Sequence, residues 1–293
     1  MKTRFNSHLV ALSLVLFGAG HAGAASTWSF TGGGGSESGA GTYGNTRGYV
    51  ETGGSGALQA SAWSNTVGTA NTQLESAYLG ANTNGNPGLG VINPDGRGGL
   101  GDNTGSNKEG TPTSGSTPGD AMDNDVRKDS MLFDFGVGRS FTLSNVTVGW
   151  WSGDSDITVL AYTGSGTPTF TSLTNGYADL LSNGWSVVKG SAGTTGTAHY
   201  SNAAGGAPAQ STNTAGYVAT AVNDLNISAR YWLIGALNTA IQTLPGGATV
   251  NGGDDFVKIA GLSGTYRIPE PSGIALGGVA LAGVVALRRR RAG

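Results

Sequence analysis

The sequence contains no cysteine among its 293 residues and only three histidines. His8 and His21 lie in an amino-terminal segment that we expect to be removed, which leaves His199, in a polar loop, as the histidine of the mature chain. These absences exclude cysteine nucleophiles, HExxH zinc sites and zinc sites built from cysteine and histidine. A Ser-His-Asp triad would have to use His199, and the GxSxG motif is absent. The sequence therefore predicts no catalytic residue and a protein that is not an enzyme.

Helical periodicity is scarce as well, whereas glycine is abundant, with 53 residues. No Gly-X-Y period is present, which excludes a collagen. Short alternating segments separated by turn residues about every eight to twelve positions favour an antiparallel β-sandwich. We predict an all-β fold of this kind, most simply a jelly roll, with a long loop at 81–120 and a second polar loop at 192–215. The expected strands span residues 27–30, 47–50, 58–63, 131–136, 141–151, 156–162, 185–189, 217–222, 229–237 and 255–259, and residues 72–79 fit either a strand or a short helix.

Two neighbouring tryptophans stand in one of the clearest expected strands, residues 141–151. Alternation places Val146, Val148 and Trp150 on one face, so that of Trp150 and Trp151 one points into the core and the other away from it. An exposed tryptophan offers a flat apolar surface on which a sugar ring can stack. Trp150 and Trp151 are therefore a candidate carbohydrate site, with core packing or a plain sheet-surface aromatic as the alternatives.

Acidic residues outnumber basic ones in the part of the chain between the two ends. Of the 16 Lys and Arg residues six lie in the terminal segments described below, whereas all 18 Asp and Glu lie between Glu37 and Glu270. Counted up to and including Glu270, the exported part thus has a formal charge of about −8, which argues against nucleic-acid binding. Four aspartates within ten residues favour a hard cation such as Ca²⁺, with solvated loop acids as the alternative. The candidate calcium ligands are Asp120, Asp123, Asp125 and Asp129.

Two pairs of carboxylates keep an enzymatic alternative open. A glycosidase needs two acids at a set separation across a cleft. Asp154 with Asp156, and Asp254 with Asp255, qualify by residue type, although no spacing in the sequence identifies the right pair. The alternative for Asp154 and Asp156 is turn capping, since aspartates flanking a hairpin turn accept hydrogen bonds from nearby backbone N–H groups.

The amino-terminal residues have the organisation of a secretory signal peptide. Lys2 and Arg4 form a basic region, residues 9–17 are apolar, and Ala22 and Ala24 form an A-x-A cleavage site. We expect residues 1–24 to be removed by signal peptidase, so that the mature chain begins at Ala25 or Ser26. A domain of about 240 residues is long enough to bury a core without disulfides.

The carboxyl-terminal 26 residues have a second export-related pattern. The triplet Pro269-Glu270-Pro271 precedes 16 uncharged residues, 272–287, and these are followed by Arg288, Arg289, Arg290 and Arg291. As a helix the uncharged run would be about 24 Å long, slightly short of a membrane core of ~30 Å. The arginines should stay cytoplasmic, which places the main domain outside. Because proline disfavours helix, the triplet should be extended and accessible to a protease or transpeptidase, although a plain membrane anchor is an alternative.

This tail resembles the PEP-CTERM sorting signal of Gram-negative bacteria in its Pro-Glu-Pro triplet, short apolar run and terminal arginines. The resemblance implies processing near Pro269–Pro271 by exosortase, a membrane cysteine protease or transpeptidase, and delivery from the inner membrane to the cell surface or extracellular matrix. We thus expect a signal peptide at 1–24, an exported domain at 25–267 and a sorting signal at 268–293.

The segment from Asp123 to Gly164 is similar to the core block of a family of exosortase-dependent surface proteins, through LFDF at 132–135 and GWWSGDSDITVLAYTG at 149–164. No chemistry follows from this resemblance. The expected function is a structural or adhesive role in association with exopolysaccharide. The alternatives are a carboxylate-dependent glycoside hydrolase or lyase, and a carbohydrate-binding module stiffened by Ca²⁺.

Overall fold

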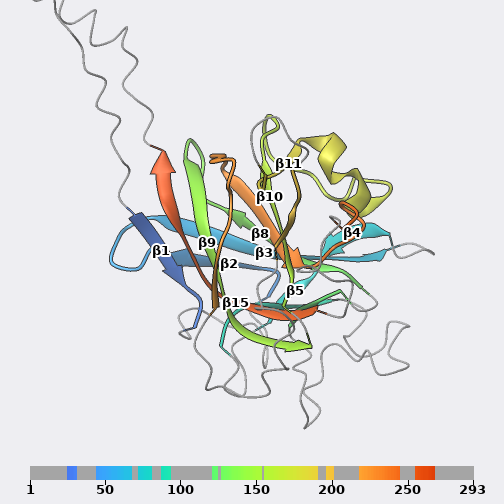
Figure 1. Cartoon of the computed structure of the whole chain (residues 1–293), viewed down its shortest axis with the longest axis horizontal. Coiled ribbons are helices and arrows are strands. Elements are labelled where there is room, and N and C mark those ends of the chain that lie inside the picture. Colours follow the sequence, from blue (N-terminus) through green and yellow to red (C-terminus); the bar gives the residue numbers. More distant parts are fainter. Residues whose placement is uncertain are drawn as a thin grey trace, which may run out of the picture.

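The fold is all-β, as predicted, and its main sheets are antiparallel (Figure 1). The computed structural model describes residues 25–31, 44–67, 72–80, 87–93, 121–124, 127–153, 155–190, 196–200, 218–244 and 255–267. Within these ranges two large sheets share one hydrophobic core, and the short strands β5 (Tyr78–Gly80) and β6 (Gly90–Ile92) form a separate ribbon.

The first sheet has the order β1-β15-β9-β13, and β7 pairs with β15. Its strands are β1 (Ala25–Ser29), β15 (Asp255–Arg267), β9 (Ser140–Gly153), β13 (Val218–Ala221) and β7 (Met122–Asp123). The second sheet has the order β11-β10-β14-β8-β3-β2, with β12 beside β10 and β4 beside β3. Its strands are β11 (Trp185–Val187), β10 (Ile157–Tyr162), β14 (Tyr231–Ala236), β8 (Asp129–Asp134), β3 (Ala57–Val67), β2 (Thr46–Val50), β12 (His199–Tyr200) and β4 (Gln73–Ser76).

Aromatic side chains fill the core between the two sheets. Trp28 from β1 makes edge-on contacts with Phe135, Phe141 and Tyr266, with ring centroids 5.2, 5.1 and 5.9 Å away. Phe135 and Phe141 are stacked at 4.0 Å. Alternation explains this placement, because every second residue of β1 is buried. The first and last strands therefore both pack against the core through one aromatic cluster.

The second sheet is buried on both faces. Ile157 and Val159 of β10 enter the core between the sheets, whereas Leu160 enters a second core on the opposite face. That second core is covered by the segment 163–184, which includes the 3₁₀ helix η2 (Gly176–Asn183), through residues such as Phe170. Neither a helix nor a covering layer was expected in this segment.

A β-bulge corrects one expected face assignment. Lys258 of β15 pairs with Trp150, and the following residue, Ile259, pairs with Val148. Gly149 is therefore an extra, unpaired residue on β9. The bulge shifts the alternation by one position. Val148 and Trp151 therefore face the core, and Trp150 does not join them.

Both expected loops contain paired strands. Residues 90–92 form β6, and Leu89 forms a bridge with Ile259, so this part of the segment 81–120 is ordered against the sheets. In the segment 192–215, His199 lies in β12 and is buried rather than exposed in a loop. Residues 72–79 form strands β4 and β5, which decides between strand and helix.

The two ends of the described chain lie side by side. Ala25, the first residue of β1, pairs with Thr265 of β15, and β15 ends at Arg267 (Figure 1). Within the described residues no helix is long and apolar enough to cross a membrane. The expected signal peptide at 1–24 and the expected span at 272–287 lie outside the described residues.

Candidate functional site

The most unusual chemistry of the described chain is a group of charged side chains buried where several strands begin or end. We call it the buried-charge end. It comprises Asp123, Arg127, Asp129, Asp156, Asp255 and Lys258, each at most 7% exposed. Asp123 ends β7, Asp129 begins β8 and Asp255 begins β15. Because buried charges are costly unless they are paired, such a group has either a structural or a ligand-binding role.

Asp255 joins three segments of the chain at this end. Its carboxylate accepts hydrogen bonds from Asn124 Nδ2 and from the backbone N–H of Asp156, both at 2.7 Å. In return the backbone N–H of Asp255 donates to Asn124 Oδ1, at 2.7 Å. These contacts tie the start of β15 to the loop at Asn124 and to the residue preceding β10. Asp255 therefore acts as a structural link between the two sheets.

Asp129 has a different environment. It is 1% exposed, and among the described residues no hydrogen bond of ordinary geometry reaches its carboxylate oxygens, although Ser64 and the Asp123 backbone lie close enough to stabilise the charged form. Burial raises the pKa of Asp129 well above its ordinary value, and the Asp123 carboxylate raises it further. Ser64, the Asp123 backbone and Arg127 offset part of this rise in pKa. A buried carboxylate in this position requires either a proton or a cation beside it.

Only part of the expected calcium cluster falls within the described residues. Asp123 and Asp129 are close enough to interact, whereas Asp120 and Asp125 lie outside the described ranges. Within those ranges no group of three or more His, Cys, Asp or Glu side chains is arranged to hold a metal ion. Two carboxylates from β7 and β8 are thus the part of the predicted cluster that the structure brings together.

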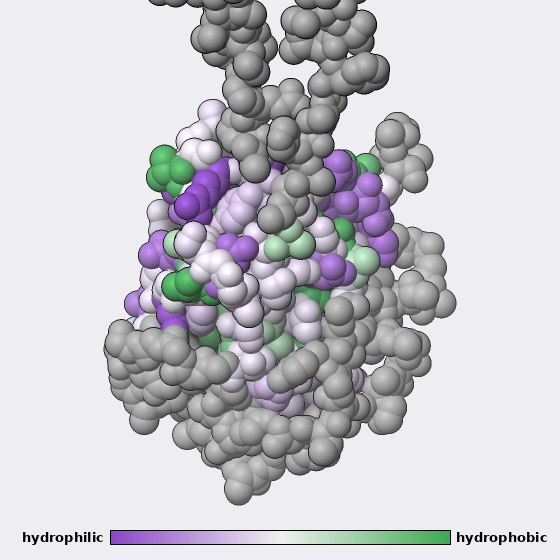
Figure 2. Space-filling model, turned by 90° about the vertical axis from the view of Figure 1, so that its left-hand side faces the viewer, coloured by the Kyte–Doolittle hydropathy of each residue, from purple (hydrophilic) through white to green (hydrophobic). Residues whose placement is uncertain are grey.

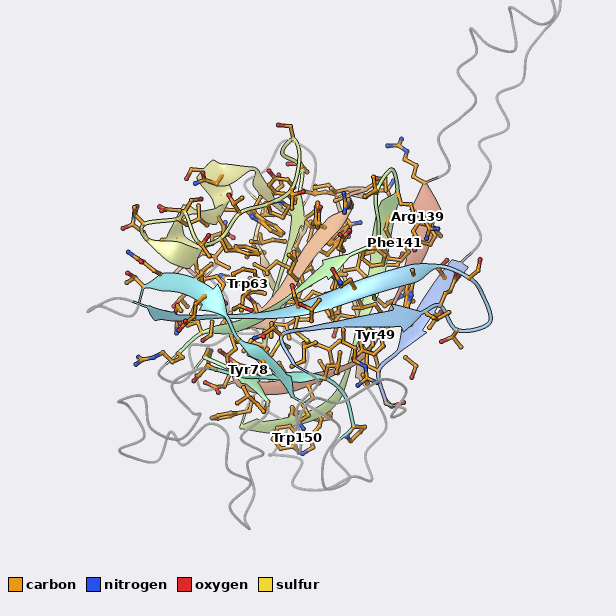
Figure 3. All side chains as sticks on the ribbon, turned by 180° about the vertical axis from the view of Figure 1, so that it is seen from behind. Tyr49, Trp63, Tyr78, Arg139, Phe141 and Trp150 are labelled. Atoms are coloured by element: carbon orange, nitrogen blue, oxygen red, sulfur yellow. The ribbon has the colours of Figure 1, made fainter. Side chains whose placement is uncertain are left out.

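The tryptophan pair is buried. Trp150 and Trp151 are 2% and 4% exposed, and they point to opposite sides of the first sheet as the alternation requires. Trp150, labelled in Figure 3, pairs in the strand register with Lys258 on β15, whose side chain is also buried. The expected exposed tryptophan is therefore wrong: neither ring presents a free face for sugar stacking in this structure.

One member of each candidate carboxylate pair lies within the described residues. Asp154 and Asp254 lie outside the described residues. Asp156 and Asp255 are 1% and 0% exposed and contact each other through the backbone N–H of Asp156. Turn capping by Asp154 and Asp156 therefore stays a prediction: Asp154 lies outside the described residues, and the printed bond at Asp156 is from its backbone N–H to Asp255 across the sheets. This contact is a cross-sheet link, and neither carboxylate faces an open cleft.

His199 is a structural residue. Its ring Nδ1 lies 3.0 Å from Thr158 Oγ1, and Nε2 lies 2.7 Å from the backbone carbonyl oxygen of Gln242. Burial lowers the pKa of His199, the Gln242 carbonyl partly offsets this, and Lys189 lowers it further. The neutral ring therefore donates from Nε2–H to Gln242 and accepts from the Thr158 hydroxyl. Both nitrogens are occupied, and neither contacts a serine or a carboxylate.

Two members of the buried-charge end were not predicted from the sequence. Lys258 stands between Val257 and Ile259 in an apolar strand, and this lone charge in a buried pattern was the available sign. Arg127 lies between the aspartates 123, 125 and 129, where a single cation among acids was equally visible. Both are buried, at 0% and 7% exposure.

The expected processing residues cannot be placed. Residues 1–24 and 268–293 lie outside the described ranges. They contain the expected cleavage site (Ala22, Ala24), the sorting triplet (Pro269, Glu270, Pro271) and the arginine cluster (Arg288, Arg289, Arg290, Arg291). The chain matches no protein-family model, no curated protein and no solved structure.

Proposed function

We propose that this chain is an exported surface or matrix protein that exosortase releases from the inner membrane. One observation carries the proposal. The described fold begins with β1 at Ala25 and ends with β15 at Arg267, and the two strands pair. The sequence placed signal-peptide cleavage just before Ala25 and the sorting triplet just after Arg267. The paired first and last strands of the described chain thus lie between the two expected processing points.

The strand order supports a jelly roll for this exported unit. Counting β1, β8, β9, β10, β11, β13, β14 and β15 as strands one to eight, the first sheet has the order 1-8-3-6. The second sheet contains the order 5-4-7-2, with β3 and β2 added beyond β8. These are the two sheet orders of an eight-stranded jelly roll. Jelly rolls occur in lectin and capsid domains, which agrees with a binding or coat role but does not identify one.

The role that we propose for the exported domain is structural or adhesive, in association with exopolysaccharide. Two features support a non-catalytic reading over a glycoside hydrolase or lyase. His199 is engaged at both ring nitrogens. Asp156 and Asp255 are buried and joined across the sheets, whereas a glycosidase needs two carboxylates facing its substrate.

The sorting proposal is tested in the native host by replacing Pro269, Glu270 and Pro271 with alanine. We expect the parent protein to be released as a species that lacks residues 1–24 and the segment after the triplet. The triple variant should stay in the membrane fraction with its carboxyl terminus intact. The measurement is the intact mass of the protein in membrane and extracellular fractions. Normal release of the triple variant would refute sorting by this signal.

A calcium-stiffened domain is the second candidate, and Asp129 favours it. Among the described residues its two oxygens have no hydrogen bond of ordinary geometry, and the Asp123 carboxylate, on the other sheet, is close enough to raise its pKa. Carboxylate oxygens of this kind are the ligands that Ca²⁺ prefers. A bound cation would add to the positive charge that Arg127 already supplies beside Asp129, and it would hold β7 to β8.

Thermal unfolding with and without Ca²⁺ tests this second candidate. If the cation binds, 100 times its dissociation constant should stabilise the parent by about 2.7 kcal/mol. Asp129→Asn should abolish this gain, and without Ca²⁺ it should be neutral or stabilising, since it removes a buried charge. Asp134→Asn is the matched control, because Asp134 lies at the far end of β8 and is paired with Arg230. An unchanged melting temperature of the parent with Ca²⁺ would exclude the site.

A further inference from the structure

We propose that one end of the exported domain rests on an anionic lipid surface while the chain is still attached to the membrane. This inference rests on the proposed function. We call this part the terminal end, and it comprises Ala25, Val50, Arg267 and the turns 51–56 and 136–139.

The strand registers bring these segments together. Val50 pairs with Ala57 across the turn 51–56, and Gln59 pairs with Asp134, two residues before Gly136. The backbone N–H of Thr52 donates to the carbonyl of Thr27 in β1, at 2.7 Å. In the first sheet Arg267 pairs with Ser140, the residue after the turn 136–139. The two turns, the start of β1 and the end of β15 therefore form one continuous surface.

The terminal end exposes apolar side chains at its turns. Val137 is 82% exposed and Val50 is 71% exposed, and within the described residues the remaining large exposed hydrophobic is Leu181, at 38%. Single exposed apolar residues are ordinary, but here the two most exposed ones lie at the same end of the fold. Val137 is held outward between Gly136 and Gly138, which have φ angles of 99° and 71° and so form a tight turn. Figure 2 looks onto this side and shows apolar and hydrophilic side chains next to each other.

Positive charge accompanies the two valines. Arg139 and Arg267 are exposed, and the Arg139 guanidinium lies over the ring of Tyr266, 5.4 Å from its centre (Figure 3). Of the acids in or beside the two turns, Asp134 is paired with the Arg230 guanidinium at 2.7 Å, and Glu51 accepts a hydrogen bond from the uncharged Gly56 N–H at 3.0 Å, so that the two arginines outnumber Glu51. Apolar tips beside arginines suit a lipid interface, where the tips enter the headgroup region and guanidinium groups bind phosphate.

The length of the connecting chain keeps this surface close to the membrane. Four residues, 268–271, separate Arg267 from the uncharged run that begins at Ser272. Fully extended, five steps of about 3.3–3.6 Å span at most ~18 Å. Because Ala25 lies beside the end of β15, an uncleaved signal segment would leave the domain from the same place. The terminal end therefore cannot move far from the bilayer, which favours lipid over a soluble partner.

The absence of cysteine allows a direct test with single thiols. Val137→Cys and Thr239→Cys are labelled with an environment-sensitive fluorophore in the full-length chain, reconstituted in vesicles of phosphatidylethanolamine and phosphatidylglycerol. Thr239 is exposed and lies beyond the opposite end of β14, close to the buried-charge end, so it is the matched control. We expect a blue shift, and quenching by lipid-borne quenchers, at position 137 but not at 239. Equal spectra at the two positions would overturn the proposal.

The dependence of the spectral shift on lipid charge tests whether anionic lipid is the partner of this surface. The shift at position 137 should decrease in pure phosphatidylcholine vesicles and in a variant with Arg139→Ala and Arg267→Ala. An unchanged shift in both would overturn the role of anionic lipid.

Flotation of the vesicles reports whether the chain is inserted at all. An inserted chain without a spectral shift at position 137 refutes the lipid contact alone. A chain that does not float with the vesicles refutes the membrane tail as well. Because the vesicles contain no other protein, a shift seen only in native membranes would assign this surface to a protein partner instead.

Discussion

The two ends of β15 place charge in opposite ways. At its start Asp255 is buried and bonded to two other segments, and Lys258 is fully buried nearby. At its end Arg267 is exposed beside Ala25 and the turn 136–139. One end of the same strand uses charge to join the sheets internally, and the other presents charge to its surroundings. The difference indicates that charge maintains the fold at the buried-charge end and is accessible to solvent at the terminal end.

The largest expected loss of stability comes from removing the Trp28 ring, which packs the first strand against the core near the terminal end. Trp28→Ala should lower the free energy of unfolding by about 3–5 kcal/mol, because it removes a buried ring that contacts Phe135, Phe141 and Tyr266. Trp63→Ala is the control, since that ring is only half-buried and its recorded ring contact is with Phe170. Chemical denaturation measures both. Equal losses would mean that β1 is not fastened to the fold through Trp28.

Breaking the buried-charge end should cost somewhat less. Asp255→Ala leaves the donors of Asn124 and Asp156 without their acceptor in the interior, and we expect a loss of about 2–4 kcal/mol. Asp179→Ala is the surface control, because Asp179 accepts hydrogen bonds at the surface from the Asn175 N–H, from Asn175 Nδ2 and from the Thr174 hydroxyl. The free energies of unfolding of both variants give the comparison. A loss for Asp179→Ala as large as that for Asp255→Ala would contradict the importance of burial.

The smallest effect concerns pH near the buried-charge end. Burial lowers the pKa of His199 below the ordinary 6.5, so the folded state resists protonation. The unfolded chain takes up the proton first, and the stability that the neutral ring contributes is therefore lost as pH falls below about 6.5. His199→Gln keeps a donor for the Gln242 carbonyl but cannot titrate. Its unfolding free energy should vary less between pH 7 and pH 5 than that of the parent; parallel curves would refute the assignment.

Alternation predicted most of the strands, because burial on one face leaves a period of two in the sequence. Residues 141–151 and 156–162 were assigned in this way and lie in β9 and β10. The same rule failed at Gly149, since a bulge is an insertion in the pairing and leaves no mark in the hydrophobic pattern. It also gave no sign that β10 would be covered on both sides, because the covering segment around η2 has no strong period of its own.

The candidate site was less accessible to sequence reasoning. Acidic residues were visible, and Asp123, Asp129, Asp156 and Asp255 were all named. Their burial and their pairing depend on strand ends that are up to 131 positions apart, as for Asn124 and Asp255. The partner of His199, the carbonyl of Gln242, is a backbone atom and has no residue signature at all. Contacts of these two kinds are fixed by topology and become visible only in the folded chain.

The place of β15 in its sheet has a consequence for the order of folding. The last strand lies between β1 and β9, so β1 has no neighbour in the sheet until residues 255–267 are available. Closing a contact between the first and last strands is slow, because the loop between them is nearly the whole domain. A chain emerging amino terminus first cannot complete this sheet until its final strand has emerged. The described strands of the second sheet, by contrast, all end by Ala236, so the second sheet can form before the first is complete.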